Sequence, residues 1–415
     1  MNPRKIVTLA LLTAVVVTAG LIVALLSVRS TSARDVSSTN PLKGSPEMVD
    51  RLAMFDAADE FDDGKLEHVR VAVNSPARVV LEDRRTNTYP RYGHWISPEV
   101  STEFGFTELI PSWNVTCPPN TGVRFDVRTR DARSGRWTPW LYVGQWGRNV
   151  GNRERVVTCD WGTVHVDNVV LDRPADAYQI RARLESFDLD TNINPSIRRV
   201  SVSYSGRVRD RETRERLTRP VTIEGDWRLD LGVPFFAQGT APANVKGSIC
   251  SPTSTTMVLS YWGVTRPLAE NALAIYDDER DIFGNWGRAV ARAGELGFDA
   301  WLMRMRNWDQ VKVMIAQGQP VIAAINFEQG QFPSSVLTDT NGHLIVIRGF
   351  TKDGDVICND PASKDKGNGV IYKADELAQA WFANAGGVAY VIRGPAQTTT
   401  VPTTAPATSP VALHY

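Results

Sequence analysis

The sequence predicts two folded domains of different class: an antiparallel β-sandwich over residues 68–205 and an α+β domain over residues 231–394. In the first region apolar and polar residues alternate, which is typical of strands with one buried face. In the second region helix caps and apolar runs follow one another in a mixed order. A chain of 415 residues is also too long for one ordinary core.

The chain begins with an apolar segment that follows basic residues. Arg4 and Lys5 precede an almost uncharged run over residues 6–28. This run is longer than the core of a usual signal peptide and long enough to span a bilayer. We therefore expect residues 1–34 to be a transmembrane anchor with a cytoplasmic N-terminus, or alternatively a cleaved signal segment. In either case the rest of the chain is extracytoplasmic, membrane-anchored in the first case and secreted in the second.

Three further segments have the composition of linkers or tails. Residues 35–67 are polar and acidic, and we expect a linker with a short helix near residues 46–58. Residues 206–230 carry a mixed charge run without an apolar period, which indicates a solvated linker. Residues 395–415 are rich in Thr, Pro and Ala, so a disordered tail is expected.

Within the predicted β-sandwich the alternation is clearest in residues 123–128, 178–185 and 200–204. This region also holds half of the twelve tryptophans of the chain. They are Trp95, Trp113, Trp137, Trp140, Trp146 and Trp161. We expect them to form the sandwich core; an aromatic ligand-binding face is the alternative.

The second domain contains readable helix boundaries. Pro252 suits the first turn of a helix that ends before Gly263, because its missing N–H is harmless there. Asn307 is a good N-cap for a helix that stops at Gly318. Further helices are expected at residues 267–276, 285–296 and 375–382, and strands at residues 321–327, 343–350, 355–359 and 388–393. The turn before residue 355 predicts that the second and third of these strands form a hairpin.

The chain has four cysteines, and export would expose them to an oxidising compartment. Cys117 and Cys159 both lie in the predicted sandwich, so we expect a disulfide between them. Cys250 and Cys358 lie in the second domain. A disulfide between these two is the structural alternative to a reactive thiol.

Cys250 is a candidate nucleophile. It stands at the start of a predicted helix, where backbone donors and the helix dipole favour a thiolate. His343 is the only histidine between Cys250 and the predicted tail, and it begins an apolar strand that could hold it beside a cleft. A thiol with a histidine base is the pattern of nucleophilic acyl transfer.

Two more residues complete this candidate site. Asp360 ends the strand that neighbours the one carrying His343, so its carboxylate could orient the imidazole. Asn359 is a rival for that task, although its side chain should point to the opposite face of the strand. Gln238 lies upstream of Cys250 and could donate to an oxyanion together with the Cys250 backbone N–H.

These residues resemble the family thirty-nine cysteine peptidases, in their stand-alone "like" branch, which is related to bacteriocin leader-processing peptidases. The matching stretches run from Val233 to Gln238, from Cys250 to Ser254, from Tyr261 to Gly263, from Gly342 to Leu344 and from Asn359 to Pro361. The resemblance covers residues 231–394 and implies a papain-like fold. It also implies the roles of nucleophile for Cys250, base for His343, orienting acid for Asp360 and oxyanion donor for Gln238.

The predicted function is therefore that of an exported papain-like thiol hydrolase acting on a peptide or a cell-envelope substrate. Two alternatives stay open: a catalytically inactive binding module at the cell surface, and an acyl transferase or transpeptidase that uses the same thioester. The formal net charge of zero, from 46 basic and 46 acidic residues, argues against a nucleic-acid partner. No cofactor or metal is expected.

Overall fold

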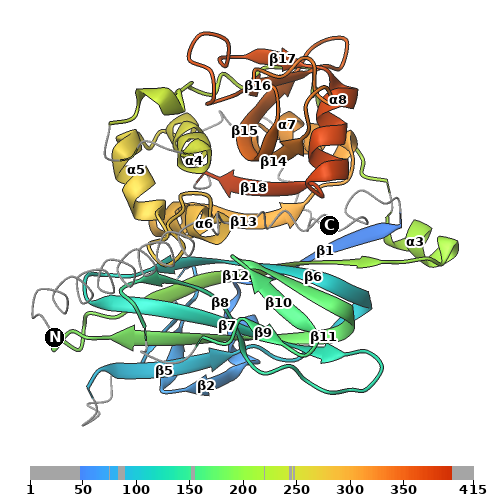
Figure 1. Cartoon of the computed structure of the whole chain (residues 1–415). Helices are drawn as coiled ribbons and strands as arrows, with labels where there is room; N and C mark the ends of the chain where they lie inside the picture. The colour runs from blue at the N-terminus through green and yellow to red at the C-terminus, as the bar shows by residue number, and fades with distance from the viewer. Residues whose placement is uncertain are drawn as a thin grey trace, which may run out of the picture. The chain divides into compact units, whose positions relative to one another are not determined.

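The computed structural model describes most of the chain between its two terminal segments. The described residues are 47–73, 75–82, 89–150, 155–218, 220–242, 245 and 248–394. They belong to one unit of contacts, Pro41–Tyr415, in which Figure 1 shows a half built of strands and a half of mixed helices and strands. The predicted anchor, residues 1–34, and the predicted tail, residues 395–415, lie outside the described residues. Among the described helices none is long and apolar enough to cross a membrane.

Strands build the N-terminal half, here called the β domain. Its elements are β1 (Met48–Phe55), α2 (Ala58–Asp62), β2 (Lys65–Glu67), β3 (Val69–Ala72), β4 (Arg78–Leu81), β5 (Arg91–Ile96), β6 (Val100–Thr116), β7 (Thr121–Asp131), β8 (Leu141–Gly147), β9 (Thr158–Cys159), β10 (Gly162–His165), β11 (Asn168–Ser186) and β12 (Ser196–Arg207). Every ladder between these strands is antiparallel. The predicted antiparallel β domain is confirmed.

The strands form one connected sheet rather than two separate ones. The long strand β11 pairs with β10 and β6 near Val169, shifts register, and then pairs with β7 from Ala175 and with β5 from Arg181. Trp113 of β6 stacks on Phe125 of β7, with ring centroids 4.1 Å apart, although β6 and β7 are not paired in the described sheet. The sheet therefore folds back so that its two layers pack face to face.

The predicted polar linker over residues 35–67 is partly wrong. The short helix expected around residues 46–58 is absent from Met48–Phe55, which is strand β1 and runs antiparallel to β12 along its whole length. Its side chains face both halves of the chain: Phe55 lies in the core of the β domain, whereas Leu52 and Met54 pack against the core of the second half. These long-range contacts favour a strand where the local composition favours a linker.

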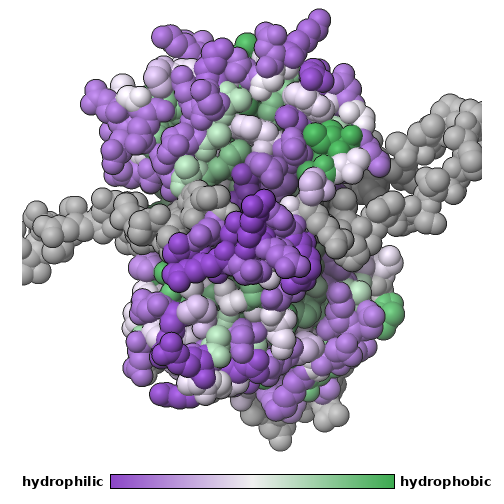
Figure 2. Space-filling view, turned by 90° about the vertical axis from the view of Figure 1, so that its right-hand side faces the viewer, coloured by the Kyte–Doolittle hydropathy of each residue, from purple (hydrophilic) through white to green (hydrophobic). Residues whose placement is uncertain are grey.

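The predicted charged linker, residues 206–230, contains a short helix, α3 (Arg211–Leu217). Asp210 caps it, since its carboxylate accepts a 2.7 Å hydrogen bond from the Thr213 backbone N–H. Most side chains of α3 are exposed. Figure 2, which looks onto the side of the molecule where α3 lies, shows a strongly hydrophilic surface there.

The C-terminal half combines helices with a second antiparallel sheet. Its elements are η1 (Gln238–Thr240), α4 (Cys250–Tyr261), α5 (Leu268–Ile275), α6 (Trp286–Glu295), β13 (Asp299–Arg304), α7 (Trp308–Ala316), β14 (Val321–Phe327), β15 (Thr340–Phe350), β16 (Val356–Asn359), β17 (Val370–Tyr372), α8 (Ala374–Ala378), η3 (Gln379–Asn384) and β18 (Val388–Arg393). The strand order is β13-β18-β14-β15-β16-β17. All predicted helices and strands of this half are present; β13 and β17 were not predicted.

Helices cover both faces of this sheet (Figure 1). Residues of α4, α5 and α6 form one apolar core with one face of the strands, and residues of α7, α8 and η3 form another with the opposite face. Helix α4 lies deepest, since every residue from Cys250 to Leu259 is buried. This position leaves the start of α4 beside the strand that carries His343.

The edge strand β13 is covered by the β domain. Asn114 of β6 exchanges two hydrogen bonds with the Ala300 backbone, at 2.7 and 3.0 Å, and the Ser112 hydroxyl accepts another from the Leu302 N–H at 3.1 Å. A buried ion pair joins Glu108 to Arg304 nearby. Side chains of β6 thus satisfy backbone groups that an uncovered edge would expose.

The tryptophans of the β domain are mainly core residues. Four are buried, namely Trp95, Trp113, Trp146 and Trp161. The half-buried Trp137 and Trp140 both lie against Arg128, whose guanidinium is 4.8 and 4.7 Å from their ring centroids. Their faces are engaged by arginine, which argues against the alternative of an aromatic ligand-binding face.

The predicted Cys117–Cys159 disulfide is wrong, because all four cysteines are free thiols. The thiol of Cys117 instead donates to the Trp146 carbonyl at 3.7 Å. Cys250 and Cys358 lie in two different apolar cores, so the alternative disulfide between them is absent as well.

Candidate active site

Cys250 is the first residue of α4. The Thr253 N–H bonds back to the Ile249 carbonyl at 3.0 Å, which begins the helix. The N–H groups of the first turn have no partner within a helix and, with the helix dipole, favour negative charge at this end. Cys250 is buried, with 7% of its surface exposed.

Small hydroxyl side chains lock α4 against the sheet. Ser254 donates a 3.0 Å hydrogen bond to the Leu344 carbonyl of β15, and the hydroxyls of Ser251 and Tyr390 are 3.2 Å apart. The two serines are small enough to let the helix approach the strands closely. The position of the thiol is therefore fixed relative to β15 and β18.

His343 lies on β15, opposite Ile325 of β14, and is 4% exposed. Its Nε2 atom is 2.7 Å from Oδ1 of Asp360. The His343 imidazole also acts electrostatically on the Cys250 thiol, and each group shifts the pKa of the other. Since Nε2 faces Asp360, Nδ1 is the ring nitrogen that remains for the thiol.

Asp360 follows directly after β16 and is completely buried. Its Oδ1 atom also accepts a 2.9 Å bond from the Ala362 N–H, and its Oδ2 accepts a 2.6 Å bond from the Tyr372 hydroxyl. Burial alone would raise the pKa of this carboxyl, but the bonds from His343, Tyr372 and Ala362 hold the pKa below its ordinary value. Sequence reasoning missed Tyr372, for which no local pattern stood out.

The charges of Cys250 and His343 depend on each other. Burial would raise the pKa of the thiol, but the imidazole beside it and the N–H groups of Leu344 and Ser251 lower that pKa below the usual range. For His343 burial acts in the opposite direction, and the bonds to Asp360 and Cys250 outweigh it and raise the pKa to about 10. Both shifts act in the direction of a thiolate paired with an imidazolium, the reactive form of a nucleophilic cysteine.

Asn359, the rival of Asp360, points elsewhere, as the alternation of side chains along a strand predicts. Its amide donates to the carbonyls of Val233 and Pro234 at 2.9 and 3.3 Å. Its oxygen accepts a 3.0 Å bond from Arg348. Asn359 therefore ties the segment before Gln238 to the sheet.

Gln238 lies in η1, and its N–H donates a 2.9 Å bond to the carbonyl of Pro361, the residue after Asp360. This bond places the Gln238 backbone beside the segment that carries Asp360. The Gln238 side-chain oxygen is buried and has no hydrogen-bond partner among the described residues. Its role as an oxyanion donor stays a prediction.

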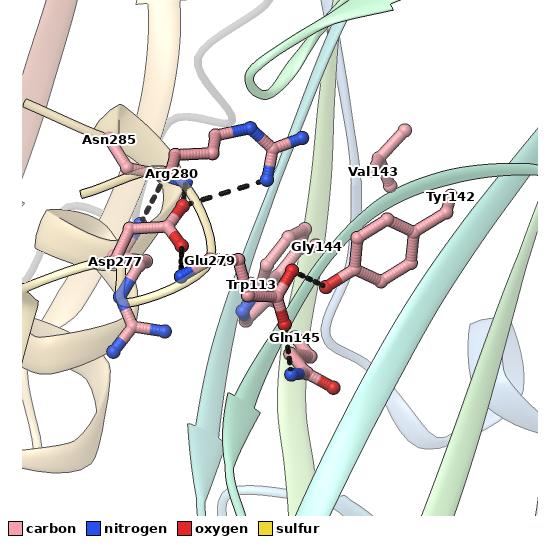
Figure 3. Close-up of a pocket in the computed structure, with 10 residues that line it drawn as sticks. Trp113, Tyr142, Val143, Gly144, Gln145, Asp277, Glu279, Arg280 and Asn285 are labelled. Carbon is pink, nitrogen blue, oxygen red and sulfur yellow. Dashed lines mark hydrogen bonds and ion pairs between the residues drawn. The ribbon is translucent and has the colours of Figure 1, made fainter. Parts of the chain in front are cut away.

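A separate small cavity lies between the β domain and α5–α6, away from these four residues (Figure 3). Glu279 dominates it: the carboxylate accepts bonds from the Tyr142 hydroxyl at 3.3 Å and the Gln145 amide at 2.7 Å. These hydrogen bonds join the two halves of the chain. Among the described residues no cluster of His, Cys, Asp and Glu could hold a metal ion.

Two family models match the chain. Residues 230–389 match the Peptidase C39 like family, and residues 51–205 match the Peptidase C39 N-terminal domain. The first match contains Cys250, His343, Asp360 and Gln238. No curated protein matches the chain.

Two solved structures resemble part of the chain. A C39-like peptidase from Bacillus anthracis is 18% identical, with 39% of the present chain and 96% of that chain covered and a TM-score of 0.30. A double-glycine motif protease from an AMS/PCAT transporter, solved with its leader peptide, is 20% identical, with coverages of 42% and 98% and a TM-score of 0.30.

Proposed function

We propose that this chain is a papain-like thiol hydrolase that cleaves a peptide or a related amide bond, because residues 230–389 match the Peptidase C39 like family. One observation carries the proposal: the His343 ring bonds the Asp360 carboxylate at 2.7 Å and lowers the pKa of the Cys250 thiol. In that arrangement His343 can accept a proton from the thiol of Cys250 at the start of a helix. The buried Asp360 carboxylate then stabilises the protonated imidazole.

The proposed reaction has two halves. The Cys250 thiolate attacks the carbonyl carbon, and the oxyanion that forms receives bonds from the Gln238 amide and the Cys250 N–H. As the C–N bond breaks, the His343 imidazolium gives its proton to the leaving amine, and a thioester remains. His343 then takes a proton from water, the hydroxyl oxygen attacks the thioester, and the acid leaves while the thiolate is restored.

The decisive test compares two cysteine variants of the full chain on a peptide library that includes cell-envelope peptides. We expect Cys250→Ala to abolish cleavage and Cys358→Ala to retain it, since Cys358 lies in a different core and burial raises its pKa well above that of an ordinary thiol. Cleavage that survives in Cys250→Ala would contradict the proposal. Wild-type protein that neither cleaves nor forms a thioester would favour an inactive binding module.

The same assay separates hydrolysis from acyl transfer. Both reactions pass through the thioester, but only a transferase passes the acyl group to an added amine in preference to water. We expect the free acid as the main product in the presence of amine acceptors. A product that contains the amine would instead identify a transpeptidase.

We further propose that the protein acts outside the cytoplasm, held to the membrane by residues 1–34. The basis is the uncharged run over residues 6–28, which suits a bilayer span better than a signal-peptide core. Cell fractionation with sequencing of the mature N-terminus tests this. We expect a membrane-bound protein with an intact N-terminus; a soluble protein that begins near residue 34 would indicate a cleaved signal.

A further inference from the structure

We propose that Tyr372 is a positioning residue of this site, whose hydroxyl fixes the Asp360 carboxylate so that it orients His343. This inference rests on the proposed thiol hydrolase function and adds a fourth member to its hydrogen-bonded chain. Tyr372 does not contact the reacting thiol in the described structure; it acts through Asp360.

The contact itself is short and completely buried. The Tyr372 hydroxyl is 2.6 Å from Oδ2 of Asp360, and neither side chain is exposed to solvent. The other carboxylate oxygen, Oδ1, is shared by the His343 ring and the Ala362 N–H. Each oxygen thus has its own donors, and the carboxylate cannot rotate without breaking a charge-assisted hydrogen bond.

The phenol is held rigidly. Tyr372 ends β17, where it pairs with Val356 of β16. Its ring packs edge-on against Phe332, with centroids 4.8 Å apart, and Phe332 in turn packs against Phe327 of β14. The aromatic core therefore sets the position of the hydroxyl, and the hydroxyl sets the plane of the carboxylate.

The chemistry of the site requires such a donor. Oδ2 of Asp360 faces a core from which water is excluded, and an ionised oxygen without a donor is strongly disfavoured there. Without the phenol, the carboxylate would turn Oδ2 toward other donors or take up a proton. Either change weakens its hold on His343. Burial and the neighbouring carboxylate raise the pKa of Tyr372 well above its ordinary value, so the phenol remains a donor at all working pH values.

Tyr372→Phe is the test, since it deletes the hydroxyl and keeps the ring. In the full chain we expect kcat to fall about tenfold or more with KM unchanged, the factor that corresponds to losing one charge-assisted hydrogen bond. We also expect the alkaline limb of the pH–rate profile to move to lower pH, because an imidazolium that is less well held loses its proton more easily.

The matched control is Tyr261→Phe, which removes a hydroxyl that donates to the Gly318 carbonyl at 3.0 Å in the same half of the chain. It should leave kcat and the alkaline limb unchanged. The proposal is overturned if folded Tyr372→Phe keeps the wild-type kcat and alkaline limb, or if it loses stability alone. It is also overturned if the control loses as much activity.

A second readout does not depend on turnover. The rate at which iodoacetamide alkylates Cys250 reports the pKa of its thiol, and we expect this pKa to be higher in Tyr372→Phe than in wild type and Tyr261→Phe. An unchanged alkylation profile would overturn the role of Tyr372 even in an active enzyme. If wild type shows no turnover at all but the alkylation profile is shifted in Tyr372→Phe, only the proposed hydrolase function is overturned.

Discussion

The hydroxyl of Ser254 donates a 3.0 Å hydrogen bond to the backbone carbonyl of Leu344, the residue that follows His343. Ser254 lies about one helical turn after Cys250 on α4 and is completely buried. This bond connects the helix that begins at Cys250 directly to the strand that carries His343. The geometry of the pair depends on this connection as well as on the two reactive groups.

We predict that Ser254→Ala lowers turnover about tenfold, because a loosened α4 misaligns the thiol and the imidazole. The free energy of unfolding should also fall by about 1–3 kcal/mol, the usual cost of losing a buried hydrogen bond. Thr253→Val is a suitable control, since the Thr253 hydroxyl bonds to the Ile249 carbonyl at the start of α4 and not, among the described residues, to the sheet. Equal turnover in Ser254→Ala and wild type would show that the connection is dispensable.

The pH dependence of turnover should be bell-shaped. Activity should rise at pH values below the usual thiol pKa of about 8.5, because the pKa of Cys250 is lowered. It should fall again as the pH passes about 10, where His343 loses its proton. A turnover that rises only near pH 8.5 and does not fall at higher pH would contradict an ion pair between Cys250 and His343.

The raised pKa of His343 also predicts how stability changes with pH. A folded-state pKa above the unfolded value of about 6.5 stabilises the fold fully below about pH 6.5, and the stabilisation is lost as the pH rises through about 10. Urea unfolding of wild type and His343→Gln at a series of pH values measures it. The difference in free energy of unfolding should shrink steadily toward pH 10; a constant difference would rule out the shift.

Gln238→Ala should lower kcat by about 10²–10³, the usual effect of deleting one oxyanion donor. The alkylation rate of Cys250 should be unchanged, because the amide is proposed to act only on the oxyanion. Gln317→Ala, at the exposed end of α7, controls for loss of a glutamine side chain. If both variants keep full turnover, the oxyanion is stabilised by other donors.

Asn114→Ala should destabilise both halves of the chain together. Asn114 is buried and makes two hydrogen bonds to the Ala300 backbone, so their loss should cost about 2–3 kcal/mol and expose the Ala300 amide to hydrogen exchange. The exposed Asn192 provides the control variant. If the β domain and the C-terminal half unfold in two separate transitions and Asn114→Ala affects only one of them, the β domain is an independent module and does not support β13.

Much of the second half could be predicted from the sequence because its signals are local. Pro252 and Asn307 mark helix starts, and the apolar runs of β14 and β18 were bounded correctly. The choice of Asp360 over Asn359 followed from the alternation of side chains along β16; in the structure Asp360 bonds His343, whereas Asn359 bonds the Val233 carbonyl.

The remaining features depend on contacts far apart in the sequence. Strand β1 is stabilised by β12, and β13 by Asn114 and β18, so neither segment shows its structure in its own composition. The disulfide prediction for Cys117 and Cys159 failed for the same reason, because pairing requires a spatial approach that spacing in the sequence does not reveal. Tyr372 has no distinctive sequence signal, because its contact with Asp360 forms only in the folded chain.

The most direct test of the central claim is the pH dependence of Cys250 alkylation by iodoacetamide, with mass mapping of the labelled residue, in wild type and His343→Ala. The account predicts selective labelling of Cys250, with an apparent thiol pKa below about 8.5 in wild type and a higher one in His343→Ala. A Cys250 thiol that titrates with the same ordinary pKa in both proteins would contradict it.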